Sequence, residues 1–155
     1  MFFDKLREKR IAKKRQAFEN SGMLRSFLYS FGTMAEGMTT FLIDEKGDEL
    51  EMVYHRVSMK DGREISSSFT LPPVTAQKLK ALIRNEEIYL WNGFNKSNSV
   101  IATGRSFSLR AGFDNYQLKA DGMVMVPEGY NEKHEILKNY LEDLVKRNYT
   151  EIGEV

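Results

Sequence analysis

Two histidines are the side chains best suited to general base chemistry, because the ordinary histidine pKa lies close to neutral pH. His55 stands beside Arg56 in a segment with strand periodicity, and His134 stands beside Glu135 in a segment with helical periodicity. Neither has a serine or carboxylate at a spacing that specifies a catalytic triad, and two isolated histidines make no metal-binding pattern. The sequence therefore predicts no catalytic residue and no metal ligand.

Acidic residues gather around Gly47, where calcium would find several carboxylate oxygens. The cluster consists of Asp44, Glu45, Asp48, Glu49 and Glu51. It lacks the ordered ligand positions and the closing glutamate of a calcium loop. Because Asp and Gly are also typical of turns, we interpret the cluster as a solvated hairpin tip.

A tight Asn-Gly turn separates Trp91 from Phe94, and Tyr89 precedes it closely. Aromatic side chains of this kind can form a platform for a sugar, a peptide or a base. Arg105, which follows a glycine, adds a guanidinium from which an anion site can be built. We name Tyr89, Trp91, Phe94 and Arg105 as candidate binding residues, with packing of the lone tryptophan in the core as the alternative.

Basic residues concentrate at the start of the chain. Residues 1–25 hold eight Lys or Arg against three Asp or Glu, whereas the whole chain has a net charge of +1. These cations could bind nucleic-acid phosphates, or an anionic membrane surface with Phe2 and Phe3 as anchors. They are Lys5, Arg7, Lys9, Arg10, Lys13, Lys14 and Arg15. A solvated charged helix is the alternative, and a pI near 7.9 is low for a dedicated nucleic-acid binder.

The composition is that of one globular domain. The chain has 155 residues, of which 41% are hydrophobic and 12% aromatic, too many for a disordered chain. The absence of cysteine excludes disulfides, thiolate metal sites and a cysteine nucleophile. The first residues lack the apolar core of a signal peptide, and no apolar run is long enough to span a bilayer. We expect a cytoplasmic protein without a cofactor.

The first half of the chain changes from helical to strand periodicity. Residues from Phe3 to about Asn20 favour a helix, which Gly22 ends. Alternating apolar residues then predict an antiparallel meander of four strands over 24–31, 38–44, 49–57 and 63–71. Two prolines stop the last strand, and Thr75 to Asn85 predicts a second helix.

The second half predicts a hairpin and a closing helix. Ile88 to Trp91 favours a short strand or extended segment, and 92–105 a long polar loop. In a hairpin over 106–113 and 116–125, Phe113 faces Tyr116, which places the apolar residues of both strands on one face. A third helix begins at Asn131 with an apolar stripe that ends at Val145.

Together these elements predict an α+β fold. We expect a single antiparallel sheet of about five to seven strands, with N-terminal, middle and C-terminal helices mainly on one face. The basic N-terminal helix would span 1–22, the α+β domain 23–148, and a frayed tail 149–155.

Two short motifs resemble a family of small uncharacterised bacterial proteins. They are Trp91-Asn92-Gly93-Phe94 with Ser97, and Gly104 with Ser106-Phe107-Ser108-Leu109. The similarity extends through Pro127 and Tyr130 into the last helix and covers roughly residues 65–146, but not the basic first helix. The resemblance implies an α+β domain of bacterial type and transfers no catalytic residue.

Three functions stay open at this point. The first is a non-enzymatic module that binds another protein through the aromatic turn, the 92–105 loop or the first helix. The second is nucleic-acid or anionic-surface binding by the first helix. The third is a hydrolase whose histidines and carboxylates are gathered by the fold. The sequence predicts no oligomeric state.

Overall fold

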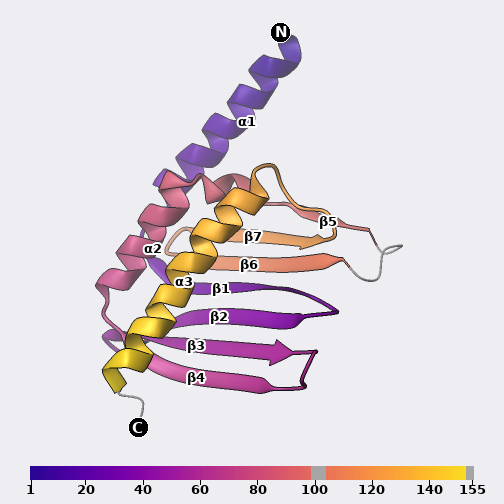
Figure 1. Cartoon of the computed structure of the whole chain (residues 1–155). Coiled ribbons are helices and arrows are strands. Elements are labelled where there is room, and N and C mark those ends of the chain that lie inside the picture. The colour runs from indigo at the N-terminus through magenta and orange to yellow at the C-terminus, as the bar shows by residue number, and fades with distance from the viewer. Residues whose placement is uncertain (99–103, 153–155) are drawn as a thin grey trace.

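The computed structural model describes residues 1–98 and 104–152, with side chains described up to Asn148. Within these residues the chain forms three α-helices, a short 3-10 helix and seven strands (Figure 1). In chain order they are α1 (Phe2–Glu19), β1 (Leu24–Thr33), β2 (Gly37–Lys46), β3 (Glu49–Ser58), β4 (Glu64–Leu71), α2 (Val74–Asn85), η1 (Ile88–Trp91), β5 (Asn95–Ser97), β6 (Arg105–Phe113), β7 (Tyr116–Met123) and α3 (Tyr130–Ile152).

The strands form one sheet in the order β4-β3-β2-β1-β6-β7-β5. Neighbouring strands are antiparallel except β5 and β7, which run parallel. The α+β fold and its three helices are confirmed, and the sheet is mixed. Strand β5 lies within the segment 92–105 that we predicted to be a loop. Sequence did not predict this strand because its three residues are polar and exposed and show no alternation of apolar residues. Residues 99–103 of that loop lie outside the described residues.

One face of the sheet forms the core together with α2 and α3, which both lie over the same side in Figure 1. Alternate strand residues such as Tyr29 and Leu109 are fully buried on this face. Leu79 of α2 and Leu141 of α3 are fully buried as well. Residues between the core positions, such as Leu28, point to the other face and stay partly exposed. The helices thus seal one face and leave the other to solvent.

The β6–β7 hairpin has the predicted register, with Phe113 opposite Tyr116 and Leu109 opposite Ala120. Its turn is fixed by Asp114, whose carboxylate accepts hydrogen bonds from the Met23 N–H (2.8 Å) and from the Arg25 guanidinium (2.7 Å). These two donors hold the pKa of the Asp114 carboxyl below its usual range. The hairpin is therefore tied to the start of β1.

The segment Ile88–Trp91 is a 3-10 helix, so the prediction of a strand there was wrong. It follows Glu87, whose φ of 54° redirects the chain after α2. A four-residue apolar run has the same pattern in a buried strand and in a buried turn of helix, so periodicity cannot distinguish them. Packing against α1 and α2 decides the conformation.

Helix α3 continues to Ile152 and so extends into the segment 149–155 that we expected to fray. Among its side chains described, up to Asn148, the last buried one is Val145. After Tyr130 the sequence contains no proline, and its next glycine is Gly153. Because each added helical residue gains one backbone hydrogen bond, a helix can propagate beyond its last core contact.

Candidate functional site

The aromatic turn is part of the core, with Tyr89 only 3% and Trp91 only 2% exposed. The Tyr89 ring stacks on Phe18 at 5.0 Å between centroids, and Trp91 lies 5.3 Å from the ring of Tyr130. Two of the candidate binding residues therefore serve packing, the alternative that the sequence left open. A surface platform built from Tyr89 and Trp91 is not compatible with this burial.

The other two candidate binding residues also have intramolecular partners. Phe94 is half-buried against the core, and the Lys96 ammonium lies 5.7 Å from its ring centroid. The Arg105 guanidinium lies 5.3 Å from the ring centroid of Tyr130 and donates a hydrogen bond to the Asn131 side chain. Arg105 thus ties the start of β6 to the start of α3.

His134 belongs to a small polar cluster inside the aromatic core. The Tyr29 hydroxyl lies 2.6 Å from His134 Nδ1 and 3.0 Å from the Tyr130 hydroxyl. Burial raises the pKa of Tyr29 and of Tyr130 and lowers the pKa of His134. The lowered pKa favours neutral His134, and its hydrogen bond with the Tyr29 hydroxyl anchors α3 to β1.

His55 lies on β3, two strands from Tyr29, and its side chain points to the opposite face of the sheet from the core-facing Tyr54 beside it. Its Nε2 atom is 2.7 Å from a carboxylate oxygen of Glu64 on the neighbouring strand β4. The two histidines belong to separate contacts, and neither lines the grooves described below. Within residues 1–98 and 104–152, no three His, Asp or Glu side chains gather where they could hold a metal ion. These contacts give the hydrolase hypothesis no support.

The cations of α1 divide into two groups. Three of them contact the body. Arg7 pairs with Glu128 at 3.0 Å, and Arg15 donates a hydrogen bond to the Tyr89 hydroxyl at 3.1 Å. Lys14 donates hydrogen bonds to the backbone carbonyls of Leu90 and Asn92. The other four make no hydrogen bond or ion pair to a described residue through their side chains. They are Lys5, Lys9, Arg10 and Lys13. The predicted basic surface is therefore only partly free.

A cationic groove of about 500 Å³ separates α1 from the body. Arg7, Arg10 and Lys14 line it from α1, and Lys133 lines it from α3. Glu87 and Glu128 partly offset these charges. Trp91 also lines this groove, although only 2% of its surface is exposed, because it lies in the core directly behind the groove wall.

A second groove of about 360 Å³ lies at the strand ends, at the right of Figure 1, and we call it the methionine groove. It is lined by Thr33, Met34, Gly37, Met38, Val57, Met59, Gly104, Ser106 and Met123. The exposed fractions of its methionines range from 36% for Met38 to 70% for Met34. None of these lining residues is charged, so the groove is largely apolar. The exposure of its methionines shows that it is open to solvent.

The sheet register brings these residues together. Val57, Met38, Gly32, Ser106 and Met123 form one row across β3, β2, β1, β6 and β7. Gly32, at the centre, has no side chain, which leaves the row hollow between its methionines. A Cβ added there would lie 2.0 Å from the Gly37 carbonyl oxygen and 2.8 Å from Met38 Sδ.

A polar hollow of about 330 Å³ continues the methionine groove and shares Met38, Ser106 and Met123 with it. The Asp121 carboxylate in this hollow accepts a hydrogen bond from Ser108 at 2.7 Å and pairs with Arg110 at 2.9 Å. The two hollows together therefore form one surface with an apolar end and a hydrogen-bonding end.

Sequence reasoning did not find this groove. Its residues are separated by as much as about ninety positions along the chain, and each methionine fits an ordinary strand end or turn. The available signal was the predicted β2–β3 hairpin, which places Met38 opposite Val57, but local pattern could not predict that β6 pairs with β1.

Comparison with known proteins adds no family to this description. No protein-family model matches the chain, and no curated protein matches it. Among the described residues, no helix has both the length and the apolar character needed to cross a bilayer. The grooves and the free cations of α1 are therefore the features that bear on function.

Proposed function

We propose that the protein is a non-enzymatic interaction module that binds a partner protein through the methionine groove. The observation that supports this proposal is the convergence of four partly exposed methionines on a groove without a charged lining residue. Methionine is flexible and polarizable, and it recurs at surfaces that adapt to protein partners. Contiguous apolar surface of this kind marks interaction sites on soluble proteins.

The chemistry of the groove favours a segment that presents large apolar side chains. Such side chains would displace water from the methionine methyl groups and from Val57, which is the main source of affinity at protein interfaces. The adjoining hollow offers Ser108 and the Asp121 carboxylate to the backbone of the same segment. A partner with an apolar anchor followed by an accessible backbone fits both parts.

A random peptide library tests this proposal with no particular partner assumed. Peptides selected on the full chain from a displayed library should contain large apolar residues. Their affinity should fall about tenfold or more when Met38→Glu and Met123→Glu place two charges in the groove. The matched control is Met23→Glu with Met125→Glu, since these methionines are 50% and 43% exposed outside the groove.

The binding position can be read from methyl-labelled methionine by NMR. The methyl signals of Met34, Met38, Met59 and Met123 should shift on peptide binding, while that of the control residue Met23 should not. Peptides that bind the groove variant as tightly as the unmodified protein would refute the proposal, and so would shifts confined to Met23 and Met125.

A second candidate function is binding of an anionic surface or a nucleic acid through α1. The observation that favours it is the set of α1 cations that have no partner among the described residues. These charges stand on a helix in which Phe18 alone is buried. We further propose, from a composition that includes no cysteine, that the protein works in the cytoplasm.

A further inference from the structure

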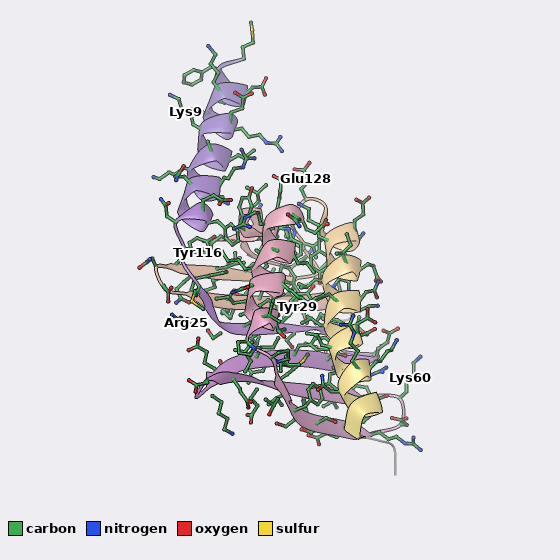
Figure 2. All side chains as sticks on the ribbon, turned by 90° about the vertical axis from the view of Figure 1, so that its left-hand side faces the viewer. Lys9, Arg25, Tyr29, Lys60, Tyr116 and Glu128 are labelled. Carbon is green, nitrogen blue, oxygen red and sulfur yellow. The ribbon has the colours of Figure 1, made fainter. Side chains whose placement is uncertain are left out.

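Helix α1 projects from the body over most of its length, as Figures 1 and 2 both show. Only Phe18, near its C-terminal end, is buried, and Ile11 is half-buried. Phe2 and Phe3 are 71% and 81% exposed, and Leu6 is 38% exposed. Three large apolar side chains thus stand in water beside the free cations, and Lys9 is labelled on this projecting part in Figure 2.

The side chains of α1 are sorted around its axis. At about 100° per residue, Phe18 and Ile11 point to the body, and Arg7 and Lys14 lie beside them. The acidic residues Asp4, Glu8 and Glu19 fall together on one flank. An arc of about 120°, which begins opposite Phe18 and runs round to the flank beside Lys14, contains no acidic residue. We call this arc the outward face. Its charged and large apolar residues are Phe2, Phe3, Leu6, Lys9, Arg10 and Lys13, of which Arg10 also lines the edge of the cationic groove.

The two sides of the helix also differ in their contacts. The cations that face the body are held by Glu128, by backbone carbonyls and by Tyr89. The side chains of Lys9, Arg10 and Lys13 on the outward face have no hydrogen bond or ion pair to a described residue. Charge and apolar surface are therefore both left available in the same arc.

We infer that the outward face of α1 binds the surface of an anionic lipid bilayer, an inference that rests on the second candidate function. Phe2, Phe3 and Leu6 enter the boundary between headgroups and acyl chains, and Lys9, Arg10 and Lys13 contact the anionic headgroups. Nucleic-acid phosphates would match the cations and bases could stack on the phenylalanines, but neither gives Leu6 an apolar environment. A bilayer interface accommodates the whole face.

Apolar anchors and cations act together in this arrangement. A single weak anchor gives only marginal membrane binding, and stable binding requires two signals such as an apolar insertion and a basic patch. Tertiary packing supplies most helical stability in proteins, and Phe18 is the one buried residue of α1, so a surface that binds the helix also stabilises it. None of the residues that line the methionine groove belongs to α1, so both surfaces remain accessible at once.

Vesicle co-sedimentation of the full chain tests the inference. Binding is expected to vesicles of equal parts phosphatidylcholine and phosphatidylserine, and at least about tenfold weaker to phosphatidylcholine alone. Phe2→Ser with Phe3→Ser should weaken binding about tenfold or more, because it removes the inserted rings. The triple variant Lys9→Gln, Arg10→Gln and Lys13→Gln should weaken it about a hundredfold, since each cation contributes about fivefold.

A charge-matched variant separates a specific face from overall charge. Lys60→Gln, Arg63→Gln and Lys78→Gln remove the same three charges from exposed positions on the body and should leave vesicle binding unchanged. Because every substituted residue is exposed, circular dichroism melting should show the same folded body in all variants. Equal losses in the two triple variants would overturn the inference.

A DNA oligonucleotide is the second probe. If the protein binds it through the α1 cations, and neither vesicle preparation is bound, nucleic acid rather than lipid is the partner and the inference is overturned. Vesicle binding that is unaffected by the phenylalanine substitutions would also overturn it. None of these outcomes depends on the methionine groove, so they are separable from a failure of the peptide experiment.

Discussion

The methionine groove and the outward face of α1 are both exposed apolar surfaces, but they are built in opposite ways. The groove is assembled from a row of residues on five strands around Gly32. The outward face lies on one continuous helix and mixes phenylalanine with free cations. The groove has shape and no charge, whereas the helix face has charge and no concave shape.

Because they are built differently, the two surfaces should depend on different forces for binding. A groove formed by tertiary structure binds by burial of apolar surface and disappears when the sheet is distorted. A helix face that needs only local structure keeps its chemistry when the body is perturbed, and it responds to ionic strength. Three perturbations separate these forces, and the largest effect is expected from a substitution in the sheet.

Gly32→Val should damage the groove and the sheet while leaving α1 intact. The new side chain would meet the Gly37 carbonyl oxygen, which lies 2.0 Å from the Cβ position, so backbone must move. We expect the free energy of unfolding to fall by about 2–3 kcal/mol. Urea unfolding measures this effect, with Thr39→Val on β2 as a β-branched control. A wild-type unfolding midpoint for the glycine variant would show that the groove does not depend on this close approach.

Salt should separate the two binding activities. Raising the salt concentration from about 0.1 M to about 1 M shortens the Debye length from about 10 Å to about 3 Å. Vesicle binding through Lys9, Arg10 and Lys13 should weaken about tenfold or more, while peptide binding in the uncharged groove should change less than about twofold. Titrations at both salt concentrations measure this. Equal salt dependence of the two activities would remove the distinction between the surfaces.

The smallest effect is expected from a change of pH. The body contains the half-buried His134, whereas the titratable residues of the outward face are only lysine and arginine. Burial places the pKa of His134 in the folded protein below its unfolded value of about 6.5. The unfolded state therefore takes up the proton first, so the stability contributed by neutral His134 is complete above about pH 6.5 and is lost as the pH falls below it.

Urea unfolding at about pH 7.5 and about pH 5.5 measures this loss. The His134→Gln variant should lose less stability between the two pH values than the unmodified protein. His55→Gln is the matched control, because His55 lies on β3 and pairs with Glu64 away from the core. An unchanged pH dependence in the His134 variant would show that the Tyr29–His134 contact does not govern acid stability.

Local sequence was sufficient for much of the fold. The basic composition without proline or glycine predicted α1, and the alternation of apolar residues predicted the meander and the register of Phe113 opposite Tyr116. These features follow from contacts between near neighbours in the chain. The same reasoning identified the cations of α1, but it could not tell that Arg7, Lys14 and Arg15 would be held by the body.

By itself, then, the sequence determined the period of each element and hence which side chains share one face of a helix or strand. Tertiary structure decided which faces meet. It buried Tyr89 and Trp91, joined Tyr29 to His134, and aligned Met38 and Met123 across Gly32. The physical reason is that periodicity fixes direction within an element, while the pairing of β1 with β6 brings together residues about eighty positions apart, which only packing of the whole chain specifies.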